Sequence, residues 1–133
     1  MTPPPAVPRV LATVSPDIQR RVRAILPECE LRFVATGTQL VRALDEARCD
    51  MVIVEMHFDE SAAMAALRLV LLREESFPIV CVRSVPPARP APPALGALRM
   101  ALGAANFIDL LQYPDDEAAN ARLRAVLEGL LPD

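Results

Sequence analysis

The stretch from Asp50 to Glu60 constrains the fold more than any other part of the sequence. Four apolar residues, Met51 to Val54, stand between the acidic residues Asp50 and Glu55. Valine and isoleucine favour strands, and a short apolar run bounded by polar residues is typical of a strand buried on both faces. In open α/β sheets, ligands bind outside the carboxyl ends of such strands. Glu55 is therefore the first candidate for a functional residue.

Composition limits the classes of protein that fit. The chain has 133 residues, 53% of them hydrophobic, which is enough for one domain with its own core. A net charge of −3 and 4% aromatic residues argue against nucleic-acid binding. The sequence contains neither a membrane-spanning run nor a signal-peptide pattern. The cysteines Cys29, Cys49 and Cys81 form no zinc or disulfide pattern, so we expect a reduced, cytoplasmic protein without a cofactor.

Strand and helix patterns alternate along the whole chain. Residues 1–8 are rich in proline and predict a flexible leader, which leaves a domain over 9–133. Strands are predicted over Arg9–Val14, Glu30–Val34, Met51–Glu55, Phe77–Val82 and Asn106–Leu111. Helices are predicted from Pro16, after a turn at Thr36–Thr38, over Ala62–Arg73, over Ala94–Gly103 and from Pro114. A stiff proline-rich loop is predicted over Ser84–Pro93.

This alternation predicts an α/β fold. Strands that are separated by helices pair in parallel through crossover connections. The unbroken apolar strands at 51–55 and 78–82 should be central, whereas the mixed strands at 30–34 and 107–111 should lie at the edges. We therefore expect a five-stranded parallel sheet of flavodoxin-like order 2-1-3-4-5 in a three-layer αβα arrangement.

Four of the predicted helices carry an apolar stripe that predicts the buried side of the helix. The stripes are Ile18, Val22, Ile25 and Leu26, then Leu40, Ala43, Leu44 and Ala47, then Met64, Leu67, Val70 and Leu71, and finally Leu123, Val126, Leu127 and Leu130. Arg21 lies off the first stripe, so we expect it to be exposed. Ser15 precedes Pro16 and is expected to cap that helix with its side chain.

Over residues 9–131 the chain resembles a response-regulator receiver (CheY-like) domain. Three local matches carry the resemblance, together with the order and length of the elements. Asp50 to Glu55 resembles the third receiver strand, and Phe77 to Ser84 resembles the fourth. Gly103 to Phe107 resembles the entry to the fifth strand. The resemblance implies the receiver fold and a role in two-component-type signalling.

The residues at the phosphorylation site of receivers do not carry over. The resemblance implies an acidic pair after the first strand, where this chain has Thr13–Ser15, and a phosphate-accepting aspartate, where it has Glu55. It also implies a hydroxyl residue, where this chain has Arg83 followed by Ser84, and a lysine, where it has Leu110. All 14 basic residues are arginine, so no lysine can substitute. Receiver phosphotransfer needs a divalent ion that oxygen ligands hold. The chain therefore resembles a degenerate, or pseudo-, receiver without a metal.

Two hypotheses concern Glu55 itself. If Glu55 and Arg83 point into one cleft, the guanidinium can fork onto the carboxylate and fix a phosphate-independent site. Otherwise Glu55 is an ordinary polar residue at a strand end. Glu55, His57 and Asp59 alternate as metal ligands can, but no second histidine or paired cysteine accompanies them, so we expect no metal site.

The sequence predicts a regulatory domain that acts by binding and is not an enzyme. We expect its partner to be another protein or a second copy, with no nucleic acid or membrane involved. The candidate partner face, in the fourth helix, fifth strand and fifth helix, comprises Leu98, Met100, Leu102, Leu111 and Tyr113, although these side chains can also belong to the core.

Two alternative functions stay open. One is a phosphate-accepting receiver that uses an atypical acid such as Asp17, Asp50 or Asp59. The other is a small-ligand or nucleotide domain of flavodoxin-like fold, although no glycine-rich phosphate loop follows the first strand.

Overall fold

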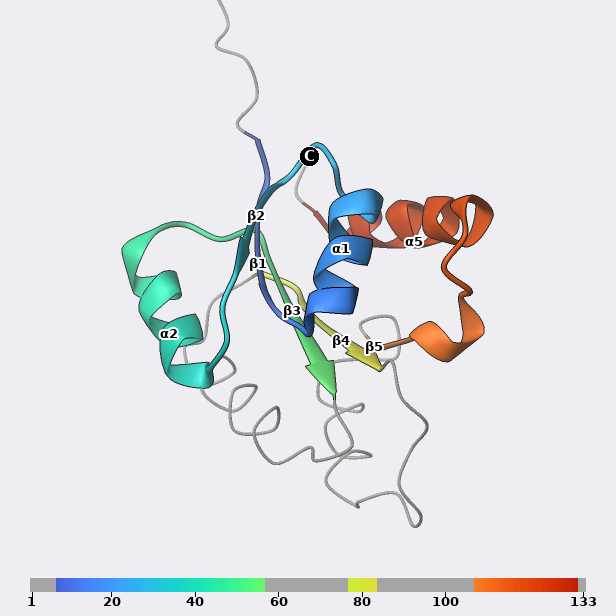
Figure 1. The fold of residues 1–133 in the computed structure, drawn as a ribbon. Helices are drawn as coiled ribbons and strands as arrows, with labels where there is room; N and C mark the ends of the chain where they lie inside the picture. Colours follow the sequence, from blue (N-terminus) through green and yellow to red (C-terminus); the bar gives the residue numbers. More distant parts are fainter. Residues whose placement is uncertain (1–6, 57–76, 84–106, 132–133) are drawn as a thin grey trace, which may run out of the picture.

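The computed structural model describes residues 7–56, 77–83 and 107–131 (Figure 1). The strands are β1 (Arg9–Thr13), β2 (Glu30–Phe33), β3 (Met51–Met56), β4 (Ile79–Arg83) and β5 (Phe107–Asp109). The helices are α1 (Pro16–Ile25), α2 (Gly37–Glu46) and α5 (Glu117–Leu130), with a 3-10 helix, η2 (Leu110–Gln112), after β5. The helices predicted over 62–73 and 94–103 and the loop predicted over 84–93 lie outside the described residues.

The five strands form one parallel sheet in the order β2-β1-β3-β4-β5, which confirms the predicted topology. α2 covers one face of the sheet, and α1 and α5 lie side by side on the other (Figure 1). Because side chains alternate along a strand, Val52 and Val54 pack in the α2 layer while Met51 and Ile53 pack in the α1 and α5 layer. All four are at most 1% exposed, as the apolar run predicted.

β5 ends earlier than the sequence predicted. The strand pattern extended to Leu111, but the strand stops at Asp109. The Asp109 carboxylate accepts a hydrogen bond from the Leu111 N–H at 3.0 Å and thereby begins η2. A side-chain cap of this kind competes with strand pairing for the same main-chain donor.

Two predicted inward positions and one predicted helix cap are corrected. Ala47 is exposed because α2 ends at Glu46 and Ala47 is only its C-cap. Val126 is 40% exposed, since the buried face of α5 consists of Ala119, Leu123 and Leu127. Ser15 is the N-cap residue of α1, but its side chain makes no capping hydrogen bond.

Arg21 is buried, although the sequence predicted an exposed position. Its side chain is 7% exposed and reaches from α1 to the segment before α5. Its Nη2 donates to the carbonyl oxygens of Tyr113 at 2.6 Å and Pro114 at 3.1 Å, and its Nε donates to Asn120 Oδ1 at 3.0 Å. Burial of a guanidinium is tolerated when its N–H groups are hydrogen-bonded in this way.

Arg124 of α5 makes the reciprocal contact. Its Nε donates to the carbonyl oxygen of Ile25 at 2.7 Å, and its Nη2 donates to that of Ala24 at 3.0 Å. These carbonyls belong to the last turn of α1, where main-chain acceptors lack partners within the helix and carry partial negative charge. Two arginines therefore hold α1 and α5 together from both sides.

The three cysteines are not joined to one another by disulfides; Cys29 and Cys49 are half-buried and Cys81 is buried. Burial, reinforced by the charges of Glu128, Glu28 and Asp50, raises the pKa of the Cys29 thiol above its ordinary value of 9.0. In the part of the chain that the structure describes, none of the helices has the length and apolar character that crossing a membrane requires.

Replacing Arg21 by alanine should lower the free energy of unfolding by about 3 kcal/mol, because the change removes the hydrogen bonds to Tyr113, Pro114 and Asn120 and opens a cavity. The measurement is equilibrium urea denaturation. Arg20→Ala is the matched control and should leave stability unchanged. Among the described residues, Arg20 pairs with Asp17, and both side chains are exposed on the surface of α1. Equal effects of the two substitutions would show that the Arg21 contacts do not stabilise the fold.

The N-caps of α1 and α2 differ in whether the side chain of the cap residue makes a hydrogen bond. The Thr36 Oγ1 accepts a hydrogen bond from the Gln39 N–H at 3.1 Å, whereas the Ser15 side chain caps nothing. Thr36→Ala should therefore destabilise the protein by about 1 kcal/mol, and Ser15→Ala should have no measurable effect on the urea midpoint. A larger loss from Ser15→Ala than from Thr36→Ala would contradict this assignment of the caps.

Candidate functional site

A hollow lies at the carboxyl ends of β1, β2 and β3, as expected for an open α/β sheet. It has a volume of about 510 Å³ and lies beside the first turns of α1 and α2. Its described lining is mostly uncharged and includes Thr13, Ser15, Gln19, Phe33, Thr36 and Gln39. Glu55 also lines it and is the only carboxylate among the described lining residues.

Glu55 is held by the main chain that leads into α1. The residue is 3% exposed, and its Oε1 accepts a hydrogen bond from the Ser15 N–H at 2.6 Å. Ser15 is the N-cap of α1, so the carboxylate lies near the positive end of a helix dipole. A short charge-assisted hydrogen bond and this dipole offset part of the desolvation cost of a buried carboxylate. No residue pattern predicts this contact, because every residue except proline supplies a main-chain N–H.

Arg83 has a different partner from the one that the sequence suggested. Its Nη2 forms an ion pair with Asp109 Oδ2, and the two side chains are only 16% and 18% exposed. The Nε of Arg83 is buried without a hydrogen-bond partner. The sequence hypothesis had paired Arg83 with Glu55 in one cleft.

The register of the sheet explains the difference. Glu55 lies beside Val82, whereas Arg83 lies beside Met56 and Asp109. Val82 packs in the α1 and α5 layer, so alternation places Glu55 on that face and Arg83 on the α2 face. A shift of one residue decides which face a side chain occupies, and the sequence alone did not supply that register.

The alternative phosphate acceptors lie away from the hollow or outside the described residues. Asp17 is exposed and pairs with Arg20 at 3.4 Å. Asp50 precedes β3, at the opposite end of the sheet, where its Oδ2 accepts a hydrogen bond from the Arg9 N–H at 2.9 Å. Asp59 and the possible metal ligand His57 are outside the described residues.

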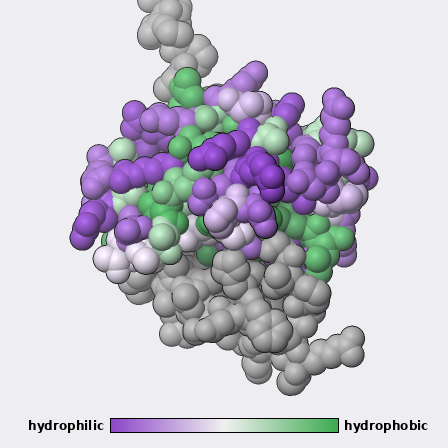
Figure 2. All heavy atoms as spheres, viewed as in Figure 1, coloured by the Kyte–Doolittle hydropathy of each residue, from purple (hydrophilic) through white to green (hydrophobic). Residues whose placement is uncertain are grey.

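The remaining predicted site residues are Leu110, Ser84 and the candidate partner face, and only some of them are among the described residues. Leu110 is buried in the α1 and α5 layer. Leu111 is 50% exposed, and Tyr113 is half-buried, with Arg122 5.7 Å above its ring. Ser84, Leu98, Met100 and Leu102 lie outside the described residues, so the partner face stays a prediction. In Figure 2, which has the view of Figure 1, hydrophilic residues predominate on the described surface, with smaller hydrophobic areas between them.

Removing the charge of Asp109 tests the Arg83 pair. Asp109→Asn keeps an oxygen that can begin η2 but leaves the guanidinium of Arg83 without its ionic partner. We expect a loss of about 1–3 kcal/mol in the free energy of unfolding, measured by urea denaturation. Asp17→Asn removes an equal charge from an exposed pair and should have no measurable effect. If both variants retain the wild-type urea midpoint, the Arg83 pair contributes nothing to stability.

No family model matches this sequence, and no curated protein matches it. Comparison with solved structures does find matches. Vibrio cholerae chemotaxis protein CheY4 superposes with a TM-score of 0.69 at 20% identity, covering 95% of this chain and 100% of that one. The signal receiver domain of an HD domain-containing protein from Pseudomonas fluorescens Pf-5 gives a TM-score of 0.68 at 19% identity, covering 94% of each chain.

A third match involves a complex. A structure of histidine kinase ThkA with response regulator protein TrrA gives a TM-score of 0.67 at 12% identity, covering 95% of this chain and 100% of the matched chain. At these identities the likeness establishes the fold. Together with the strand order, the comparisons show that this chain has the fold of a response-regulator receiver domain.

Proposed function

We propose that this chain is a pseudo-receiver: a regulatory module of a two-component-type system that acts by binding a protein, without phosphorylation as its switch. The receiver fold supports the signalling context. The arrangement around Glu55 supports independence from phosphorylation, and it is the observation on which the proposal chiefly rests.

The Glu55 carboxylate is engaged within the protein. Its hydrogen bond to the Ser15 N–H ties the end of β3 to the start of α1. A phosphate acceptor must instead present an oxygen to the incoming phosphoryl group, beside a divalent ion. Magnesium prefers octahedral oxygen coordination with one or two carboxylates, and the described lining offers one, which is 3% exposed. The described residues that line the hollow do not fit the metal chemistry of receivers.

The comparison with solved structures also supports a protein partner. The similar structure that contains histidine kinase ThkA and response regulator protein TrrA is itself a protein complex. Leu111, one of the candidate partner residues, is 50% exposed and can therefore contact a partner near the end of β5.

The hollow itself favours one second candidate. Its volume of about 510 Å³ lies within the range of small-molecule sites, so a flavodoxin-like ligand-binding domain is the competing function. A thermal-shift screen against nucleotides and flavins separates the two, since a ligand that binds only the folded state raises the unfolding temperature.

Incubation with acetyl phosphate and Mg²⁺, followed by intact-mass spectrometry, tests the main proposal. We expect no stable addition of a phosphoryl group, because Glu55 is held by Ser15 and no second described carboxylate lines the hollow. An authentic receiver domain treated in parallel is the positive control. A stoichiometric phosphoryl adduct that maps to an aspartate or glutamate of this chain would overturn the proposal.

A further inference from the structure

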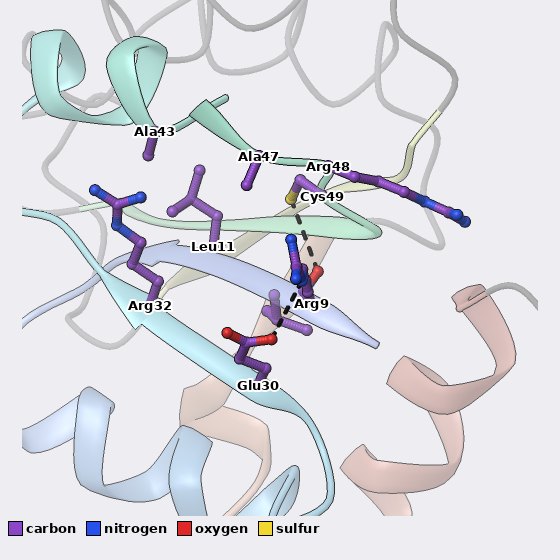
Figure 3. A pocket seen from close by; sticks show the side chains of 9 residues that line it. Arg9, Leu11, Glu30, Arg32, Ala43, Ala47, Arg48 and Cys49 are labelled. Carbon is purple, nitrogen blue, oxygen red and sulfur yellow. Dashed lines mark hydrogen bonds and ion pairs between the residues drawn. The ribbon is translucent and has the colours of Figure 1, made fainter. Parts of the chain in front are cut away.

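A second, smaller hollow lies at the opposite end of the sheet. It has a volume of about 100 Å³ and forms where α2 ends over the first residues of β1. Its apolar part includes Leu11, Ala43 and Ala47, and the small alanine side chains leave the space between α2 and β1 open (Figure 3). This hollow does not involve Glu55.

Three arginines line the same hollow, namely Arg9, Arg32 and Arg48 (Figure 3). Each pairs with a carboxylate: Arg9 with Glu30 at 3.2 Å, Arg32 with Glu46 at 2.9 Å and Arg48 with Asp50 at 3.3 Å. The three arginine side chains are 50%, 53% and 77% exposed. Exposed ion pairs of this kind are weak and exchange readily, and a guanidinium has five N–H donors. The rim can therefore accept a further carboxylate from outside.

The adjacent edge of the sheet is also available in the part of the chain that the structure describes, where β2 pairs only with β1. The Glu30 N–H donates to the Pro8 carbonyl at 2.8 Å, and the Val34 N–H donates to the Ala12 carbonyl at 2.9 Å. In a parallel pair the main-chain groups of alternate residues point to opposite sides. The main-chain N–H and C=O groups of Leu31 and Phe33 consequently face away from β1, toward the open edge of the sheet.

We propose that an extended segment of a partner protein adds to the edge of β2 and places an acidic side chain against Arg32. Main-chain groups at an open edge give affinity in this mode of recognition, and side chains give specificity. The register aligns Arg32 with Leu11, so its side chain lies on the α2 face beside the hollow.

The charge of Glu30 adds a second requirement for the sequence of the bound segment. Glu30 lies two residues before Arg32, on the same face of β2, and it is exposed. A partner side chain opposite Glu30 should be neutral or basic, because like charges directly across a strand pair are destabilising. The recognised segment therefore carries an acid two positions from a neutral or basic residue. This inference rests on the proposal that the chain binds a protein.

A labelled peptide that alternates valine and threonine and carries one central glutamate is a suitable probe. Fluorescence polarisation should show saturable binding, which weakens about tenfold in Arg32→Gln or when the glutamate is replaced by glutamine. The two changes together should cost little more than either alone, since they remove the same contact. Arg20→Gln, an equal charge change on α1, should bind like wild type.

Main-chain addition has its own readout. Nuclear magnetic resonance should show the largest peptide-induced shifts at the amides of Leu31 and Phe33. The peptide amides form two alternating sets, and N-methylation of the set that faces β2 should abolish binding, whereas N-methylation of the other set should not. The inference is overturned if no saturable binding is seen up to about 1 mM peptide, since a weaker affinity is negligible. It is also overturned if the peptide binds Arg32→Gln and the wild-type protein equally. The phosphodonor assay is independent of these results: a failed peptide with no phosphoryl adduct rejects only this surface.

Discussion

The burial of β3 on both faces is the constraint on which the rest of the structure depends. Its residues Met51 to Val54 are at most 1% exposed, so helices must cover both sides of the sheet. Parallel strands with crossover helices meet that requirement, and they bring the ends of β1 and β3 together. Glu55 follows directly after the buried run. The same packing that stabilises the core therefore places a carboxylate beside the start of α1.

Arginine makes polar connections between neighbouring elements of the same layer in this lysine-free chain. Arg21 and Arg124 join α1 to α5 through main-chain carbonyl oxygens, and Arg83 pairs with Asp109 across β4 and β5. A guanidinium presents several donors in a fixed plane, so one side chain can satisfy two or three acceptors at once. Lysine has a compact charge and does not fix such geometry as well.

The two ends of the sheet offer different chemistry. At the carboxyl end, the described lining is mostly uncharged and Glu55 is engaged by the main chain of Ser15. At the amino end, exposed arginines surround a small hollow next to the β2 edge. The first arrangement supports a site that does not transfer phosphate, and the second supports a surface that recognises a charged segment. The proposed function, regulation by binding a protein, requires only a surface of the kind found at the amino end.

The sequence by itself determined the order of the elements, the parallel sheet and the core of β3, because hydrophobic periodicity and helix-separated strands leave few other arrangements. It also identified Glu55 as the residue at the end of that strand. Only the tertiary structure decided that Glu55 and Arg83 occupy opposite faces, that Arg21 is buried and that Ala47 borders a hollow. Those outcomes depend on strand register and on where helices end, which long-range contacts set and local residue patterns do not encode.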